Sequence, residues 1–555
     1  MKKTLTVLSA FIISATNTFG QAPFNTKEYV DIGNIKAAML LHGDMNWDVA
    51  TQSSQCEFPK GSGIHLSTAT SVWMGGYDNQ NQLRISSQTY RQTGNDFWPG
   101  PLDNNGSLNL ATSTQWARIW KVNFIEISQH ISNTNRSVNN TPPSILEWPA
   151  KGNPYAKGNN GASLTIATDM APFVDVNSDG SYDPLSGDYP DIKGDQMLWW
   201  VFSDNGPTHN NTASQTLQVE VHAKVYAYSR GTTLDNIVFY EMDIHNRSAS
   251  DYPTFRLAIS ADMDLGYFND DYIGFDSSRR LGYVYNGATT DGAGQLNAYG
   301  TTPPIAGYTF LKMPGDNGTN FLPAGSFMTF NNDNSVAGNP QNATEFYNYM
   351  TSRFRDGKHL NNDFAGKGVP SFGRGSGPQA NYIFPGDPAD TTAWSECNSY
   401  NPTGDRRFVL STGDISLVHN SKASIAFALV TTERGANNTC PGVDITGIKD
   451  VTDTAWKYFQ NPPSGRLTVQ DIALSNSLQL HPNPTTNLLH IGLVDGALPA
   501  DAALTVYDIT GRKMNVSYSR NGNTLDADVS ALPAGVYNIR LGDAEKHATA
   551  VFVKQ

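Results

Sequence analysis

One segment of the chain, DVNSDGSYDP, places side-chain oxygens at alternate positions, a pattern typical of a calcium loop. Asp175, Asn177 and Asp179 occupy its first, third and fifth positions. Gly180 follows at the sixth, where glycine permits a sharp turn, and Asp183 stands at the ninth. Alternate residues of such a loop converge on one cation. We therefore expect a calcium site with ligands drawn from Asp175, Asn177, Asp179, Ser181, Asp183 and Asp188.

This loop differs from the helix-flanked calcium loop of an EF-hand. Ser186 stands where that loop carries a bidentate glutamate, and Pro184 prevents an exit helix from forming. The pattern is similar instead to the helix-free calcium loops of thrombospondin type 3 repeats. Because residues 187–190 form a second turn, the chain can fold back and bring Asp188 or Asp191 to the cation. The alternative is an Asp-rich turn that binds no metal.

A second acidic cluster, ADMDLGYFNDDYIGFD, spans the end of a predicted strand and the loop that follows it. Carboxylates this close repel one another unless a cation or protons neutralise them. Calcium fits such a cluster, although the spacing matches no standard loop, and a solvated acidic turn is one alternative. Another is a glycosidase pair, in which one carboxyl is the acid and the other the nucleophile or base. The candidate metal ligands here are Asp262, Asp264, Asp270, Asp271 and Asp276.

Aromatic residues are abundant enough to suggest stacking on sugars, but we interpret most of them as core. The run MLWWVF, which contains Trp199 and Trp200, predicts a buried strand. Trp98 lies in a loop rich in Gly and Pro and is a candidate for an exposed platform. The motifs GxSxG, HExxH and GxxxxGK[ST] are missing, so we assign no catalytic residue.

Strand patterns dominate the elements that must position these residues. The segments SQTLQVEVHAKVYAYS, NIVFYEMDIHN, TFRLAISADMD and ASIAFALVTTE alternate apolar and polar residues. Turn clusters separate them, which favours an antiparallel sandwich over βαβ units. Helical spacing of apolar residues predicts one helix over residues 443–459. We therefore predict an all-β fold, with a large antiparallel β-sandwich-like body, one late helix and a small C-terminal Ig-like β-sandwich.

Charge and cysteine content narrow the range of partners. The formal net charge is -13, so the clustered Lys and Arg needed to bind nucleic acid or an anionic membrane are not expected. The surplus of carboxylates makes divalent cations more suitable partners for this protein than nucleic acid or an anionic membrane. The three cysteines, Cys56, Cys397 and Cys440, are too few for a disulfide scaffold and are not spaced as zinc ligands. A bridge between Cys397 and Cys440 and an unpaired, inert state are both open alternatives.

The N-terminus has the pattern of a cleavable signal peptide over residues 1–20. Lys2 and Lys3 precede an apolar stretch from about Leu5 to Ala15, and small or polar residues follow. This stretch is shorter than the roughly 20 apolar residues that a membrane-spanning helix needs. We expect cleavage before Gln21 and no transmembrane segment in the mature chain.

A breaker, NPPSG at residues 461–465, ends a body domain that we place at residues 21–465. New strand patterns then occupy residues 474–555. Their motifs are PNP at 482–484, VYDITGR at 506–512, LPAGVYNIRL at 532–541 and a terminal strand that ends in Lys554. In these motifs the module resembles the type A C-terminal sorting domain of Bacteroidetes type IX secretion substrates. The resemblance implies export to the cell surface or the medium, with the type IX translocon and a sortase-like peptidase as partners.

The body also resembles an uncharacterised region common to large secreted Bacteroidetes proteins. Motifs that carry this resemblance include FPKGSGIHLSTATSVWMGGYD, DVNSDGSYDPLSGDYPDIKGDQMLWWVFSD and YIFPGDP. The family implies a secreted, β-rich protein but supplies no reaction. We therefore expect a calcium-stabilised structural, adhesive or binding protein without catalysis. The alternative is a glycan-binding module or a glycoside hydrolase that uses the acidic-loop carboxylates, with extracellular polysaccharide as its partner.

Overall fold

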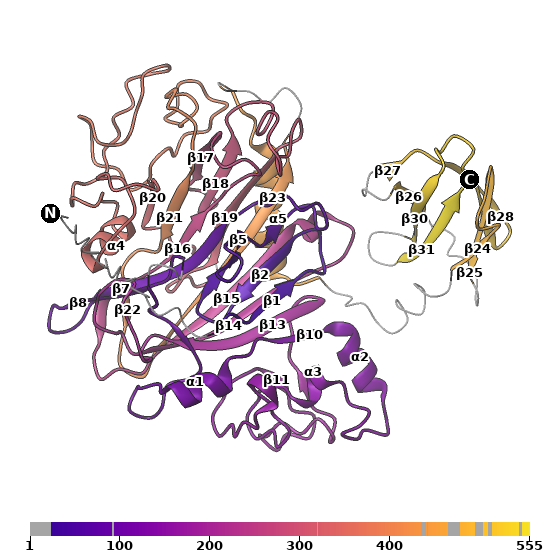
Figure 1. Ribbon diagram of the computed structural model, residues 1–555, viewed down its shortest axis with the longest axis horizontal. Helices are drawn as coiled ribbons and strands as arrows, with labels where there is room; N and C mark the ends of the chain where they lie inside the picture. The colour runs from indigo at the N-terminus through magenta and orange to yellow at the C-terminus, as the bar shows by residue number, and fades with distance from the viewer. Residues whose placement is uncertain are drawn as a thin grey trace, which may run out of the picture.

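The computed structural model describes residues 24–90, 94–318, 320–434, 440, 442–463, 478–493, 503–508, 513–542 and 547–555. The expected signal peptide and most of the expected domain boundary lie outside these residues. The described chain forms a body, up to residue 463, and a C-terminal module from residue 478 (Figure 1). Strands paired in antiparallel sheets dominate both, so the all-β prediction is confirmed.

The first large sheet of the body has the strand order β1-β2-β3-β7-β16-β21-β20, and β6, β8 and β22 pair at its sides. Within the described residues it has ten strands. They are β1 Lys27–Val30, β2 Lys36–Leu40, β3 Asp44–Met45, β6 Cys56–Glu57, β7 Ala69–Tyr77, β8 Leu83–Ser87, β16 Tyr252–Asp262, β20 Ser326–Phe330, β21 Arg407–Ser411 and β22 Ile415–Leu417.

The second large sheet has the order β10-β13-β14-β15-β23-β19-β18-β17, with β9 paired to β13. Its strands are β9 Trp98–Pro99, β10 Trp120–Asn123, β13 Gln196–Ser203, β14 Val219–Ala227, β15 Ile237–Asn246, β17 Asp271–Asp276, β18 Leu281–Asn286, β19 Pro304–Lys312 and β23 Lys422–Glu433. Two small hairpins complete the strands of the body, β4 Trp47–Asp48 with β5 Ser53–Ser54 and β11 Phe173–Val174 with β12 Tyr189–Pro190.

The inner faces of the two large sheets share one hydrophobic core. The first sheet contributes Val72 and Ile259 to it, and the second contributes Val221 and Tyr240. Burial of these faces is the main favourable contribution to folding. The body is therefore a sandwich, as the sequence predicts.

The second sheet is also buried on its outer face. There a second core forms against helix α5 (Thr446–Gln460) and against the segment between β10 and β13. Successive side chains of a strand point to opposite faces, so Trp200 belongs to the inner core and Trp199 to the outer one. Every residue of β13 is buried, which confirms the buried strand predicted from MLWWVF.

Helix α5 confirms the late helix, but the described residues also contain four shorter helices that were not predicted. They are α1 Leu110–Trp116, α2 Phe124–Ser132, α3 Pro143–Leu146 and α4 Ala343–Met350. In Figure 1, α1, α2 and α3 gather near β11 at one edge of the body. Helix α2 begins with a capping box between Asn123 and Glu126, which satisfies backbone N–H groups at its N-terminus. Single-turn 3-10 helices at 159–161 and 233–236 complete the helical elements.

The C-terminal module packs two four-stranded sheets around a core of its own. Leu489 and Leu525 come from one sheet, and Val506 and Ile539 from the other. The sheet orders are β24-β25-β29-β28 and β27-β26-β30-β31. The strands are β24 Leu478–His481, β25 Leu488–Leu493, β26 Ala503–Asp508, β27 Lys513–Met514, β28 Ser517–Asn521, β29 Thr524–Asp528, β30 Gly535–Gly542 and β31 His547–Lys554.

Cys397 and Cys440 form a disulfide, and Cys56 is a free, wholly buried thiol. The disulfide links two segments 43 residues apart in the sequence. Both cysteines lie against the outer core of the second sheet. Burial also raises the pKa of the Cys56 thiol, so little reactive thiolate forms there.

The thiol of Cys56 should react with a thiol reagent only after the protein unfolds. We expect no labelled cysteine in the native protein, one in denaturant, and three after reduction in denaturant, as counted by mass spectrometry. Labelling of Cys56 in the native protein would contradict its buried position.

The Cys440→Ser variant should lose about 4 kcal/mol of the free energy of unfolding, because a loop of this length is no longer closed.

Candidate metal centre

Antiparallel pairing brings two distant acidic segments to one end of the first sheet. Asp262 is the last residue of β16 and Arg407 is the first of β21, and the two are direct cross-strand partners. Asp264 follows β16 by two residues, and Asp405 precedes β21 by two. Because the strands run in opposite directions, the chain leaving β16 lies beside the chain entering β21. The strand register therefore brings the three aspartates together.

Asp262, Asp264 and Asp405, the acidic trio, offer one carboxylate oxygen each within 4.8 Å of one another. Of the described residues, they form the one group of three acidic, His or Cys side chains that meets this distance. Their Oδ2 atoms have protein partners, namely the Tyr90 hydroxyl and Arg407 for Asp262, Thr68 for Asp264, and Arg407 for Asp405. The three Oδ1 atoms are buried and have no hydrogen-bond partner among the described residues. Such oxygens suit a hard cation.

One guanidinium faces the three carboxylates of the trio. Arg407 Nη2 lies 3.1 Å from Asp262 Oδ2 and 3.2 Å from Asp405 Oδ2. Burial and then the neighbouring charge of Asp264 raise the pKa of Asp262 well above its usual range. Burial also raises the pKa of Asp264. The ionised trio therefore carries negative charge that Arg407 alone does not balance, and a divalent cation would supply the difference.

The structure divides the five-carboxylate cluster expected from the sequence. Asp270 and Asp271 lie at the start of β17 and accept hydrogen bonds from the backbone N–H groups of Gly292 (2.9 Å) and Leu265 (3.2 Å). Asp276 lies at the far end of the same strand, where it pairs with Arg279 at 2.9 Å. Five residues of extended chain carry Asp276 about 17 Å from Asp271, so closeness in sequence does not become closeness in space.

A buried neighbour of Asp270 and Asp271 is Asp291, which the sequence analysis did not single out. Asp291 Oδ1 accepts from the backbone N–H of Tyr267 at 3.1 Å, and its Oδ2 accepts from that of Tyr299. Burial raises the pKa of Asp291 to about 6. These carboxylates hold loops together through backbone donors.

The predicted calcium loop forms the tip of the β11–β12 hairpin. Asp175 accepts from the backbone N–H groups of Asp179 (3.2 Å) and Gly180 (2.8 Å), and Asp179 accepts from that of Ser181 (2.8 Å). Asn177 donates to Asp179 Oδ2 at 2.8 Å. The acids of this loop do not meet the 4.8 Å distance that the trio meets. Their oxygens are instead used largely in turns within the loop.

Asp188, within the second turn at residues 187–190, folds back into this loop, as the sequence predicts for Asp188 or Asp191. Its two carboxylate oxygens accept from the backbone N–H groups of Val176 (2.9 Å) and Asp183 (2.8 Å), so it spans both halves of the loop. Burial raises the pKa of Asp188, and the charges of Asp175 and Asp179 raise it further. The loop thus gathers negative charge around a buried carboxylate.

A cavity of about 290 Å³ adjoins the trio, with Asp262 and Arg407 in its lining. Strands β7, β16, β20 and β21 of the first sheet, helix α4 and three loops contribute to its walls. Tyr90 lies beside the pair, because its hydroxyl donates to Asp262 and accepts from Arg407 Nε at 3.1 Å. Most of the other lining residues are amides, hydroxyls or phenylalanines.

Trp98 is not the exposed platform that its loop composition suggested. Its side chain is buried, and its indole N–H donates to the backbone carbonyl of Thr208 at 2.8 Å. It also pairs with the second sheet as part of β9. The polar partner of the indole and its apolar neighbours account for Trp98 as a core residue.

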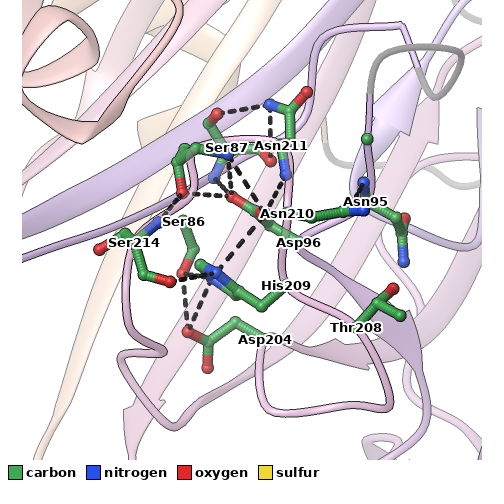
Figure 2. Close-up of polar contacts among 12 residues, drawn as sticks. Ser86, Ser87, Asn95, Asp96, Asp204, Thr208, His209, Asn210, Asn211 and Ser214 are labelled. Atoms are coloured by element: carbon green, nitrogen blue, oxygen red, sulfur yellow. Dashed lines mark hydrogen bonds and ion pairs between the residues drawn. The ribbon is translucent and has the colours of Figure 1, made fainter. Parts of the chain in front are cut away.

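A buried His209 holds the loop that forms one wall of the cavity (Figure 2). Ser86 donates its hydroxyl hydrogen to Asp204 at 2.6 Å, so its oxygen accepts from His209 Nε2 at 2.9 Å. His209 Nδ1 faces the Ser214 carbonyl at 3.0 Å, and a carbonyl can only accept. Both ring nitrogens therefore lie within hydrogen-bond distance of an oxygen, which fixes the ring at both ends.

Two buried carboxylates lie close to the ring of His209. His209 lies 3.5 Å from Asp96 and 3.8 Å from Asp204, and burial raises the pKa of both acids. Asp96 also accepts from the backbone N–H of Asn211 at 2.7 Å. Asn210 and Asn211 line the cavity directly after His209, so this network fixes their position.

The C-terminal module matches the family described as "Secretion system C-terminal sorting domain" over residues 479–555. Residues 479–555 are a type IX secretion sorting domain. The sorting domain implies recognition by the type IX machinery and export to the cell surface or extracellular space. In the part of the chain that the structure describes, we find no helix with the length and apolarity needed to cross a membrane.

Comparisons of the whole chain with curated proteins and with solved structures add little to the assignment of the sorting domain. No match was found among curated proteins. Among solved structures, a polysaccharide lyase aligns with 9% sequence identity and a TM-score of 0.18, covering 65% of this chain and 35% of the lyase. The chain thus spans about a third of that protein's length. A likeness this slight supports no statement about activity.

Asp405, Tyr90 and the His209 network were not predicted as site residues. Asp405 stands directly before two arginines and a strand, in DRRFVLS, which is the one local signal that it faces a strand end. Its partners are more than a hundred positions away in the sequence, and only the pairing of β16 with β21 brings them together. His209 carries no local motif.

Replacement of His209 by Gln should lower the free energy of unfolding by about 3 kcal/mol, because the buried polar groups around the ring lose their shared partner. Urea denaturation of the full chain would measure this. His359→Gln is a matched control, since the ring of His359 contacts the Leu360 carbonyl and its change should cost much less. Equal effects of the two substitutions would contradict the structural role of the His209 ring.

Proposed function

We propose that this protein is a type IX cargo that works outside the cell as a calcium-stabilised binding protein. The observation that carries the calcium part is the acidic trio, in which three buried Oδ1 atoms have no donor among the described residues. Calcium takes six to eight oxygen ligands and accepts carboxylates and waters together, so three protein oxygens leave positions for solvent or ligand. The Asp175–Asp188 loop is a second proposed calcium site, supported by its spacing and by the buried Asp188.

Geometry favours binding over glycoside hydrolysis. A glycosidase needs two carboxyl groups on either side of the bond that it cleaves. Asp262 is the one carboxylate among the described residues that line the cavity, and its neighbour Asp264 does not line it. Asp262 is also held by Tyr90 and Arg407. We therefore propose a role in adhesion or binding, with surface attachment or release by a sortase-like peptidase after export.

The trio is tested by counting bound calcium ions. Asp264→Asn should lose one ion relative to the wild type in isothermal titration, and it should lose the part of the thermal stabilisation that this ion supplies. At a calcium concentration of 100 times Kd, one ion contributes about 2.7 kcal/mol to the free energy of unfolding. Asp175→Asn should lose a different ion.

Asp276→Asn is the matched control for this experiment. It removes an acid that belongs to the same sequence cluster but is paired with Arg279, so it should keep every ion even if its melting temperature falls. If Asp264→Asn binds as many ions as the wild type, the trio is not a calcium site. If chelator leaves the melting temperature of the wild type unchanged, the whole calcium proposal fails.

The export route is tested by removal of residues 479–555 in a cell with a type IX system. The shortened protein should remain inside the cell envelope, while the full chain reaches the surface or the medium, as seen by fractionation and immunoblotting. Full-length Asp264→Asn, which keeps the sorting domain, should be exported like the wild type. Equal export of the shortened and full chains would mean that the domain does not act as the export signal here.

A further inference from the structure

The cavity beside the trio is lined by side chains that both donate and accept hydrogen bonds. Five are amides, namely Asn210, Asn211, Asn332, Asn339 and Gln341. Four are hydroxyls, from Ser71, Thr89, Tyr90 and Ser260. An amide or hydroxyl can match a ligand group that is itself both donor and acceptor. Sugar hydroxyls are such groups. They lie on adjacent carbons, close enough together for neighbouring side chains to form hydrogen bonds with them.

The cavity also has an apolar wall. Phe330 and Phe346 line it, and Trp73 packs behind them with ring centroids 5.9 and 4.7 Å from theirs. All three rings are buried in one hydrophobic cluster, so they are held in place. A pyranose ring has an apolar C–H face, and a rigid aromatic wall provides a surface for it.

Two buried polar atoms among the lining residues have no partner among the described residues. These are Oδ1 of Asp262 and Nη1 of Arg407, whose side chains are 5% and 6% exposed. A buried acceptor and a buried donor without partners are unfavourable unless a ligand, an ion or water satisfies them. Asp262 Oδ1 belongs to the trio, so an ion there would satisfy it, and a ligand in the cavity meets the amides and hydroxyls of the lining.

The charges and the size of the cavity exclude other ligand classes. Asp262 and Arg407 are the charged residues among the described lining, and they pair with each other, so the cavity has no excess positive charge to hold a phosphate or sulfate. Its polar walls do not suit a lipid chain. A volume of about 290 Å³ lies at the lower end of the range for ligand pockets, which suits a single sugar ring and not an extended peptide.

The polar wall of the cavity is ordered before any ligand binds. Asn210 and Asn211 are positioned by the His209 network, and Asn339 donates to Asn332 Oδ1 at 2.8 Å. Gln341 donates to the Asn339 backbone carbonyl at 3.1 Å. Ordering these side chains in advance lowers the entropy cost of binding.

From this geometry we infer that the cavity is a binding site for one neutral sugar residue of a glycan. The amide and hydroxyl side chains form hydrogen bonds with the hydroxyl groups of the sugar, and Phe330 and Phe346 contact the C–H face of the sugar ring. This inference adds a ligand and a site to the proposed binding function. It shares Asp262 with the trio but does not require that calcium is bound.

The test is titration of the full chain with free glucose, galactose, mannose and N-acetylglucosamine, followed by saturation-transfer NMR and calorimetry. The double variant Asn332→Ala/Gln341→Ala removes two exposed amides from the cavity rim. It should weaken the affinity for the sugar that binds best by about tenfold, because two hydrogen bonds are lost. Asn334→Ala is the matched control, since it is an exposed amide of the same segment that does not line the cavity, and it should leave the affinity unchanged.

Several outcomes would overturn this inference. One is that the folded wild type binds no neutral sugar, with or without calcium. Another is that the rim variant and Asn334→Ala lose sugar affinity equally. A third is that the protein binds glucuronate or inorganic phosphate in preference to the neutral sugars. Circular dichroism of the variants checks that each is folded.

The same variants separate this inference from the calcium proposal. Asn332→Ala/Gln341→Ala should bind as many calcium ions as the wild type while losing sugar affinity. Asp264→Asn should lose an ion while a sugar, titrated in chelator, binds it as it binds the wild type in chelator. Loss of the ion in the rim variant, or loss of chelator-resistant sugar binding in Asp264→Asn, would contradict the assignment of two distinct sites.

Discussion

The body keeps many carboxylates out of water, and each of them must be balanced by something other than solvent. Burial of an unpaired charge is costly, so the balancing groups determine how the loops are arranged. Glu220 uses His222 and Arg247, which hold its pKa at about 2 against the effect of burial. Asp188 uses backbone N–H groups, and Asp96 and Asp204 use His209. The acidic trio differs from all of these, because three carboxylates share one guanidinium.

The scaffold that makes this possible is a sandwich whose second sheet is buried on both faces. Two cores fix that sheet, and the first sheet packs on it with β16 next to β21. Packed interiors resist small adjustments, so the strand ends, and the acids attached to them, have little freedom to move apart. Repulsion within the trio is therefore not relieved by movement of the backbone.

The sequence predicts the elements much better than the site. Alternation identifies strands such as β13, and apolar spacing identifies α5, because both signals are local. The four short helices were missed although α2 and α4 each have an Asn N-cap followed three residues later by Glu, which is a readable signal. Asp276 was grouped with Asp262 by proximity in sequence, and Asp405 was left out by distance in sequence. The register of β16 against β21 brings Asp405 to the trio, and the extended strand β17 carries Asp276 away from it. No local pattern encodes either placement.

Asp262 belongs to the trio and to the wall of the cavity at once. Because the two proposed sites share this carboxylate, binding at one would change the affinity of the other. If an ion in the trio changed the affinity of the cavity for a sugar by some factor, a sugar in the cavity would change the affinity of the trio for the ion by the same factor. Arg407 extends this linkage to Asp405 across the sheet. Through one cross-strand pair, Asp262 and Arg407, the calcium concentration outside the cell would thus control the affinity of the proposed sugar site at this end of the sandwich.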